Sequence, residues 1–467
     1  MTGRNRRGDF RDAPTMSRSM RCLLAVLFLP LATAWAAAAA GEAAAARDEA
    51  ASGRLTRLER RAAAAVDRNA PAALALLERA VDINSGSMNF EGVRSVARLL
   101  TPEFEALGFA TQWVDGRGWG RAGHLIARRM GLKGAPRVLL IGHLDTVFER
   151  DSPFQKFERL SETSARGPGI IDMKGGDVVM LLALQALRDA GALDRLSLVA
   201  ILIGDEEDSG APLSLARRDL IEAAGWADVA IGFEDGAGDP RTAVISRRGS
   251  GSWRLVTTGR PAHSSQIFRP DIGSGAIYEA ARILAAFHEA LRGEQYLTVN
   301  PGVIVGGTSI TFDGDESRGT AFGKTNVIAE SARVAGDLRS ISIAQREGAK
   351  ETMRRIVDGH LPQTTAEITF DDGYPPLAPS EGNRRLLALY DRASRDLGFG
   401  EVAAVDPSRA GAADVSFTEG LVDMALDGIG LMGDGGHTAS ETADLKTLPS
   451  QAKRIAVTLL RLSEGKR

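Results

Sequence analysis

Cysteine is almost missing from this chain of 467 residues, which contains only Cys22. Cys22 lies inside an apolar run near the N-terminus and not behind it, where a lipid-modified cysteine would have to stand. Removal of that run would leave a protein without any thiol. Disulfide bonds, cysteine nucleophiles and thiolate metal sites are then excluded, so a metal ion could be held only by His, Asp and Glu side chains.

The sequence also lacks an excess of positive charge and an apolar run long enough to cross a membrane. Its 57 basic residues are outnumbered by 60 acidic ones, which gives a formal net charge of -3. A mildly acidic chain is a poor candidate for binding the phosphate backbone, so we expect no nucleic-acid partner. The apolar run from Cys22 to Ala34 is shorter than the ~20 residues that span a bilayer, so we expect no stable membrane anchor.

The beginning of the chain has the organisation of an export signal. An Arg-rich stretch extends to Arg21, the apolar run follows, and the small residues Ala-Trp-Ala at 34–36 offer a cleavage site. We therefore expect residues 1–41 to be a signal peptide and the mature protein to be periplasmic or secreted. Residues 42–70 are rich in Ala and Arg and are expected to form a linker or frayed helix, and Pro71 can open the next helix.

Strands and helices alternate over residues 71–248. Short continuous apolar runs at 138–141, 196–203 and 229–233 are typical of buried strands. Stretches with helical apolar spacing separate these runs at 177–190 and 213–224. Buried strands separated by helices predict an α/β fold with a mainly parallel sheet and helices on both faces.

The pattern changes after Arg248. Residues 249–372 predict a strand, a helix, two strands, a helix and a strand, which together form a small α/β sandwich. From 373 to 467 long amphipathic helices and short apolar strands return. We expect a smaller domain inserted into a larger one formed by 71–248 and 373–467, an arrangement tolerated where the ends of a surface loop lie close together.

Polar side chains gather where predicted strands of the larger domain end, or in the Gly-rich turn between them. They are His143, Asp145, Asp172, Glu206, Glu207 and Glu234. Because ligands of open α/β sheets bind beyond the carboxyl ends of the strands, we expect these side chains to meet. Most of these carboxylates follow an apolar run, where an uncompensated negative charge is costly. The cluster therefore predicts bound metal cations.

Four short motifs carry a resemblance to a known family. They are Gly-His143-Leu-Asp145-Thr-Val, Gly-x-x-Asp172-Met-Lys-Gly-Gly, Asp-Glu206-Glu207 and a late Gly-Gly-His437. Their sequences and order resemble peptidase family M20, the metallopeptidases that include zinc aminoacylases, succinyl-diaminopimelate desuccinylase, acetylornithine deacetylase and secreted glutamate carboxypeptidases. The resemblance implies that the larger domain is catalytic and that the inserted one is a lid or dimerisation domain.

The resemblance also implies two divalent metal ions. Zinc is the first expectation, and cobalt or manganese are alternatives because carboxylate-rich sites accept several divalent ions. Asp172 would bridge the two ions, with His143 and Glu234 completing one shell and Glu207 and His437 the other. Mixed His and carboxylate ligation with an open position also suits catalytic zinc.

Two acidic residues are expected to act without binding metal. Asp145 would hydrogen-bond the other ring nitrogen of His143 and fix its tautomer. Glu206 would be the general base that takes a proton from the attacking water and passes it to the leaving amine.

The resemblance also implies functions for three residues of the inserted domain. His263, in Arg-Pro-Ala-His263-Ser-Ser, is similar to a lid histidine that stabilises the oxyanion and can act in the partner subunit, which implies a homodimer. A helix cap is the alternative for His263. Asn326 and Arg339 match positions near the substrate carboxylate, which suits the forked Arg side chain. An ion pair with Asp337 is the alternative for Arg339.

These observations predict a metal-dependent hydrolase that cleaves an amide bond of small peptides or N-acyl amino acids. Export and the use of Glu234 as a ligand favour an exopeptidase similar to the glutamate carboxypeptidases. An N-acyl amino acid deacylase or dipeptidase of the same family is one alternative, and a secreted binding protein without catalysis is another. A serine hydrolase would need Gly-x-Ser-x-Gly and a zincin His-Glu-x-x-His, and the sequence contains neither.

Overall fold

The computed structural model describes residues 55–313 and 318–465. The expected signal peptide at 1–41 lies outside the described residues, as do residues 42–54. Among the described residues, no helix combines the length and apolar character that a membrane span needs.

Helix α2 (Arg57–Val81) opens the described chain and is longer than the sequence predicted. Thr56 caps it, because its hydroxyl accepts the Glu59 N–H while the Glu59 carboxylate accepts the Thr56 N–H. Pro71 was expected to open a helix, but it lies in the middle of α2. Apolar residues on both sides of Pro71, such as Val66 and Leu77, are fully buried. Packing of this face therefore outweighs the hydrogen bond that an interior proline removes.

The larger domain is built on a six-stranded sheet with strand order β1-β2-β6-β3-β7-β16. The strands are β1 (Ala110–Asp115), β2 (Gly123–Arg129), β3 (Arg137–His143), β6 (Ser197–Ile203), β7 (Val229–Gly232) and β16 (Met424–Leu426). β6, β3, β7 and β16 run parallel, and β1 and β2 add antiparallel pairs at one edge. The predicted α/β class with a mainly parallel sheet is confirmed.

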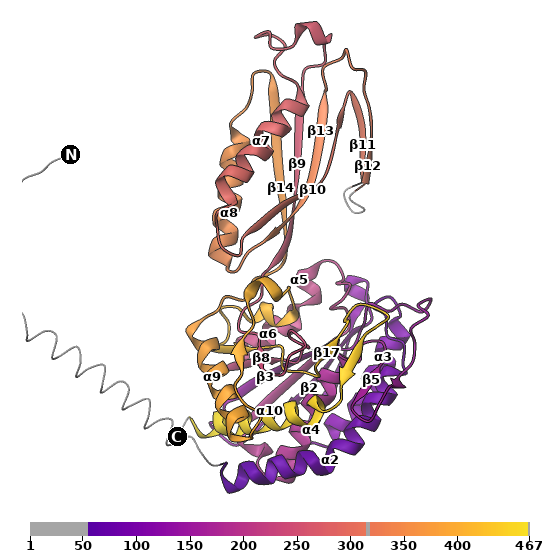
Figure 1. Cartoon of the computed structure of the whole chain (residues 1–467), viewed down its shortest axis with the longest axis vertical. Coiled ribbons are helices and arrows are strands. Elements are labelled where there is room, and N and C mark those ends of the chain that lie inside the picture. The colour runs from indigo at the N-terminus through magenta and orange to yellow at the C-terminus, as the bar shows by residue number, and fades with distance from the viewer. Residues whose placement is uncertain (1–54, 314–317, 466–467) are drawn as a thin grey trace, which may run out of the picture. The chain divides into compact units, whose positions relative to one another are not determined.

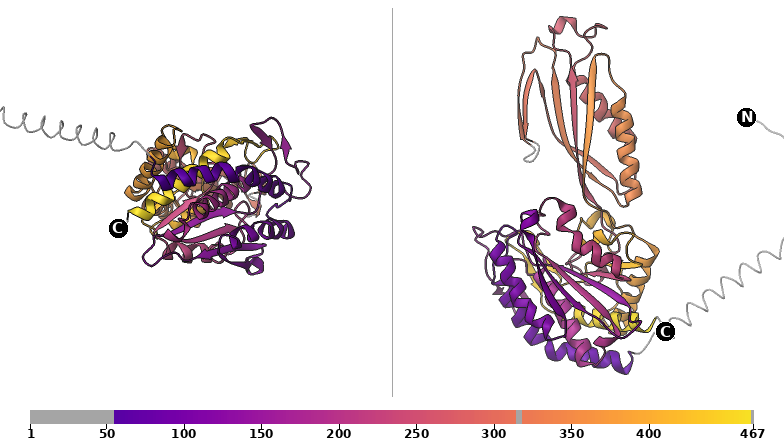
Figure 2. Two further views of the ribbon diagram at one scale, coloured as in Figure 1. Left: turned by 90° about the horizontal axis from the view of Figure 1, so that it is seen from below. Right: turned by 180° about the vertical axis from the view of Figure 1, so that it is seen from behind.

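Helices cover both faces of this sheet, because alternate residues of its strands enter two different cores. Val138 and Leu140 of β3 belong to one apolar cluster, and Leu139 and Ile141 belong to another. The first core lies under α2, α3 (Phe90–Glu105), α4 (Lys174–Asp189) and α10 (Thr447–Glu464), and the second lies under α6 (Arg218–Trp226). Figure 2 shows α2 lying alongside α4 and α10.

Several short strands and two further helices belong to the larger domain. They are β4 (Glu158–Arg159), β5 (Ser164–Arg166), β8 (Thr242–Ala243), β15 (Ala403–Ala404), β17 (Gly433–Asp434), β18 (Thr442–Asp444), α5 (Leu213–Ala216) and α9 (Glu381–Asp396). The predicted helix over 213–224 is split into α5 and α6 at Arg217. Strands β17, β18, β5 and β4 form a small sheet, from which the loop 435–441 projects.

The inserted segment forms a sheet of its own, drawn in Figure 1 with two helices against it. Its antiparallel order is β10 (Thr298–Gly307), β13 (Ser331–Arg339), β9 (Ser250–Gly259) and β14 (Thr364–Tyr374). Helices α7 (Ala276–Leu291) and α8 (Ile343–Asp358) pack on it around Trp253, Phe287 and Met353. The hairpin β11 (Ser309–Asp313) and β12 (Arg318–Phe322) was not predicted, because most of its side chains are exposed and no apolar run marks it.

Candidate metal centre

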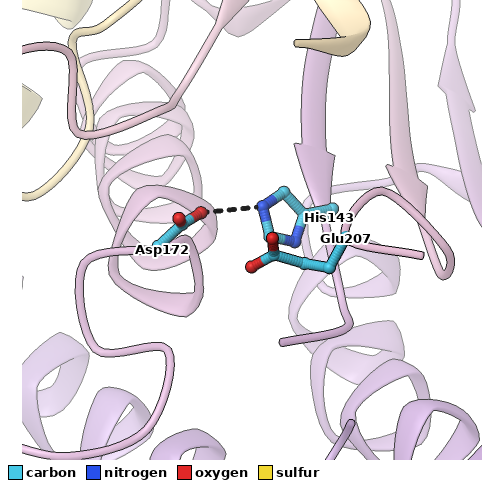
Figure 3. A group of neighbouring side chains, drawn as sticks. All are labelled: His143, Asp172 and Glu207. Atoms are coloured by element: carbon cyan, nitrogen blue, oxygen red, sulfur yellow. Dashed lines mark hydrogen bonds and ion pairs between the residues drawn. The ribbon is translucent and has the colours of Figure 1, made fainter. Parts of the chain in front are cut away.

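His143 is placed by the end of β3, where the strand leaves the core of the sheet. Its ring is buried, with Nδ1 3.1 Å from the Asp145 carbonyl oxygen and 3.5 Å from Asp145 Oδ1. Its Nε2 lies 3.0 Å from Asp172 Oδ1, a contact that Figure 3 marks. A proton on Nδ1 that is donated to Asp145 leaves Nε2 as the nitrogen that can bind a metal ion.

Asp172 contacts both histidines of the cluster, one with each carboxylate oxygen. Its Oδ2 lies 2.8 Å from His437 Nε2, which in turn lies 3.1 Å from Glu207 Oε2. On the other side, Glu234 Oε1 lies 3.8 Å from His143 Nε2. One oxygen of Asp172 thus contacts His143, which Glu234 approaches, and the other contacts His437, which Glu207 approaches.

The loop 435–441 delivers His437 from the far end of the chain. The His437 backbone has a φ of +62°, in the left-handed region that side chains other than Gly rarely occupy. Such conformations gather at functional sites, where surrounding structure holds them in place. The turn between β17 and β18 thus aims an exposed histidine at the buried carboxylates.

Carboxylates dominate the electrostatics of the cluster. Burial raises the pKa of Glu206 and Glu234 well above the usual range, and burial also raises the pKa of Glu207. Burial acts in the same direction on Asp172, but hydrogen bonds with His143 and His437 lower its pKa below the ordinary value.

The two histidines respond in the opposite sense. Hydrogen bonds with Asp172 and Glu207 raise the pKa of His437 to about 11. Burial lowers the pKa of His143, but hydrogen bonds with Asp145 and Asp172 outweigh burial and raise it well above its usual value. The carboxylates therefore stabilise positive charge on the two histidines that lie between them.

The cluster fits divalent metal ions. One ligand atom each of His143, Asp172 and Glu207 lies within 4.8 Å of the others, as Figure 3 illustrates. Glu207 Oε1 is buried and has no hydrogen-bond partner among the described residues. A buried oxygen without a partner is costly, and a cation would satisfy it. The donor set of imidazole nitrogens and carboxylate oxygens is the one that catalytic zinc accepts.

Asp145 does more in the structure than orient His143. Its carboxylate is fully buried and accepts the Ser87 hydroxyl at 2.6 Å. It also accepts the backbone N–H groups of Glu206 at 3.0 Å and Glu207 at 3.1 Å. The nearest Asp145 acceptor for the His143 ring is the carbonyl and not the carboxylate. Asp145 thus fixes the turn that presents Glu206 and Glu207.

Glu441 is a positioning residue that the sequence reasoning missed. Its buried carboxylate accepts the backbone N–H groups of Gly169 at 3.0 Å, Ile171 at 2.9 Å and Asp172 at 3.2 Å. Burial raises the Glu441 pKa to about 7, against the effect of these donors. Because Glu441 ends the loop that carries His437, it ties that loop to the turn of Asp172. The only signal in the sequence was an acidic residue four positions after His437.

His263, Asn326 and Arg339 lie in the inserted domain, and none of their hydrogen bonds or ion pairs with described residues reaches the cluster. His263 Nδ1 lies 2.8 Å from Ser265 Oγ and caps the short turn that follows. The Asn326 carbonyl accepts the Ser264 N–H, and Arg339 pairs with Asp337 at 2.8 Å. The alternatives named for His263 and Arg339 are therefore present, and the substrate roles of all three residues stay predictions.

His124 is a buried histidine outside the cluster. Its Nε2–H donates to the Ala216 carbonyl at 2.8 Å, its Nδ1 accepts the Gly204 N–H at 3.1 Å, and its ring stacks on Trp119. Burial lowers its pKa to about 4. The unfolded chain binds this proton near pH 6.5, so the folded state loses stability as the pH falls from about 6.5 to 4.

Replacement of His124 by Gln should reduce this loss of stability at low pH, because Gln does not titrate. Between pH 7.5 and 4.5 we expect the free energy of unfolding of the metal-free wild type to fall by ~2.5 kcal/mol more than that of His124→Gln. Urea unfolding at the two pH values measures the difference. Equal pH dependence of both proteins would contradict a neutral, buried His124.

The fold and the cluster define the class of protein. Carboxylates and His143 gather beyond the ends of parallel strands, and the loop 435–441 adds His437 to a donor set that suits divalent ions. Together with the inserted sandwich domain, this organisation fits a metallopeptidase. The chain belongs to peptidase family M20/M25/M40, whose sequence profile matches residues 139–461. The family predicted from the four motifs is confirmed.

Individual relatives agree with this assignment. Carboxypeptidase G2 of Pseudomonas sp. (strain RS-16) is 26% identical over 85% of this chain and 90% of its own length. Succinyl-diaminopimelate desuccinylase of Cupriavidus pinatubonensis is 27% identical over 66% of this chain and 79% of its own. The solved structure of a Bacillus subtilis protein described as a dinuclear metal binding peptidase of family M20 has a TM-score of 0.59 at 16% identity, covering 85% of this chain and 99% of that one.

Proposed function

We propose that this protein is an exported exopeptidase that removes a C-terminal glutamate, or a similar acidic residue, from small peptides and N-acyl amino acids. The observation that carries the proposal is the position of Asp172, which contacts His143 through one oxygen and His437 through the other. The similarity to carboxypeptidase G2 over most of both chains supports a carboxypeptidase activity. The basic and apolar segments within residues 1–41 support export.

We propose further that two divalent ions bind, with zinc expected first and cobalt or manganese as alternatives. His143 and Glu234 would hold one ion, Glu207 and His437 the other, and Asp172 both. Such ions lower the pKa of a water molecule from 15.7 towards about 7 and polarise the carbonyl group that is attacked. The described dinuclear site of the Bacillus subtilis neighbour supports the number of ions.

Glu206 is the residue we assign as general base. It directly precedes the ligand Glu207, and Asp145 holds the N–H groups of both residues. Adjacent residues in such a turn can face different sides, so one carboxylate can bind metal while the other accepts a proton from the attacking water. The same carboxyl group can then return that proton to the leaving amine.

The inserted domain supplies the remaining proposed parts. Asn326 and Arg339 would bind the substrate carboxylate, and His263 would stabilise the oxyanion, in its own or a partner subunit. Large apolar side chains are exposed on this domain, which supports a homodimer; they are Phe268, Ile277, Tyr278, Ile304 and Phe322. A light-scattering mass equal to one chain would argue against the dimer.

A deacylase is the second candidate, because a desuccinylase is also among the relatives. A hydrolysis screen separates the two activities. One set of substrates consists of dipeptides with C-terminal glutamate, and the other of N-acetyl and N-succinyl amino acids with neutral or basic side chains. We expect the dipeptides to be cleaved faster. Faster cleavage of the N-acyl amino acids would favour the deacylase over the exopeptidase. Cleavage of neither set would leave the secreted binding protein as the better reading.

A further inference from the structure

Arg217 is a fully buried guanidinium beside the segment that carries Glu206. Its Nε donates to Asp414 Oδ1 at 2.6 Å and its Nη1 to Asp205 Oδ1 at 2.8 Å. Its Nη2 lies 2.9 Å from the Asp205 carbonyl oxygen and 3.1 Å from the Ser209 hydroxyl. The side chain therefore holds both ends of the segment 205–209.

The hydroxyl group of Tyr374 joins the same network. It contacts Arg217 Nη2, lies 3.0 Å from the Ser209 hydroxyl, and donates to the Glu206 carbonyl oxygen at 3.3 Å. The Tyr374 ring packs edge-on against Phe417, with 5.0 Å between ring centroids. Replacement of Tyr374 by Phe would thus remove the polar contacts and keep the packing.

The backbone of Glu206 is consequently fixed on both sides. Asp145 accepts its N–H, and Tyr374 donates to its carbonyl oxygen. Because side-chain rotamers depend on backbone dihedral angles, a fixed backbone restricts where the Glu206 carboxylate can point. Placement within about 0.5 Å is what a proton-transfer group needs.

Tyr374 also belongs to the connection between the two domains. It is the last residue of β14, and the pairing of β14 with β9 shifts register between Asp371 and Tyr374. Three residues later, Leu377 exchanges two backbone hydrogen bonds with Arg247, which lies just before the chain enters β9. The residue that touches the Glu206 carbonyl is therefore part of the strand by which the chain leaves the inserted domain.

We propose that Tyr374, held by Arg217, is a positioning residue that fixes Glu206 and couples its placement to the connection between the inserted domain and the larger domain. This proposal rests on the assignment of Glu206 as general base. The proposal extends that assignment, because the conformation of the connection between the domains would then influence kcat.

The test compares Tyr374→Phe with Tyr296→Phe, the same chemical change at a partly exposed residue in the turn between α7 and β10. With the dipeptide cleaved fastest in the screen, we expect Tyr374→Phe to lower kcat about tenfold to a hundredfold, with KM changed less than about twofold. Bound metal should match that of the Tyr296→Phe control. In a Glu206→Gln background, Tyr374→Phe should cause no further loss, since its effect passes through Glu206.

Hydrogen exchange of the metal-free protein provides a measurement that needs no substrate. We expect faster amide exchange over residues 205–210 in Tyr374→Phe and no change in Tyr296→Phe. This exchange measurement does not depend on the proposed peptidase activity. It can therefore test the role of Tyr374 even if the proposed substrates are not cleaved. If Tyr374→Phe does not fold, Ser209→Ala serves instead, because it removes one hydroxyl from the same network.

Three outcomes would overturn the proposal. One is a kcat within twofold of wild type together with unchanged exchange over 205–210. Another is a loss of metal, which would mean that Tyr374 acts through the ligands. The third is a loss of turnover that multiplies with that of Glu206→Gln, which would make the two residues independent.

Discussion

Glu206→Gln is expected to lower kcat about a thousandfold, in the range that general acid–base catalysis contributes. Gln has the shape of Glu but cannot take up the proton of the attacking water, and its backbone can keep the hydrogen bonds with Asp145 and Tyr374. Metal content and the urea midpoint should therefore stay at the wild-type values. Steady-state kinetics with the preferred dipeptide measure the loss.

Glu222→Gln is the matched control, because Glu222 is exposed on α6. It should retain wild-type turnover. If Glu206→Gln kept a tenth of the wild-type kcat, Glu206 would be removed from the role of base. The Glu206 carboxyl group beside the ligands would then have a structural role.

Asp172→Asn is expected to have an effect at least as large, because Asp172 is the residue that contacts both halves of the cluster. An amide supplies one weaker, uncharged oxygen ligand in place of two carboxylate oxygens, so one ion would lose this ligand and the other would keep a weaker one. We expect metal content to fall from two ions per chain to one or fewer, and turnover to fall more than about a thousandfold. Elemental analysis after dialysis measures the first change and kinetics the second.

Exhaustive chelation of the wild type should reproduce this loss, and added zinc, cobalt or manganese should restore turnover. The exposed Asp151→Asn variant controls for the loss of one carboxylate and should bind two ions. Turnover that survives complete chelation would refute a metal-dependent mechanism. Retention of both ions in Asp172→Asn would show that Asp172 does not bridge them.

The sequence predicted the parts of the site that depend on strands. His143, Glu206 and Glu234 follow apolar runs, and the ends of parallel strands meet at one edge of the sheet, so their proximity could be expected. His437 is different, because it comes from a loop next to short strands that no apolar run marks. Only the resemblance to a family placed it in the cluster.

The backbone contacts of two carboxylates could not be predicted from the sequence, for the same physical reason. Asp145 and Glu441 each act through backbone N–H groups, and every residue except proline has one. Nothing in the sequence distinguishes the amide of Ile171 or Glu207 from any other. Their roles depend on where distant segments come together, and the same holds for the helix that continues through Pro71.

The loop 435–441 has a consequence for the order in which the protein matures. Its His437 and Glu441 lie within the last tenth of the chain, whereas their partners at 169–172 and 207 are synthesised far earlier. His437 and Glu441 can therefore make these contacts only after the chain has been synthesised past position 441. A chain cut short ahead of position 437 would lack both residues and also α10, which packs on α2 and α4.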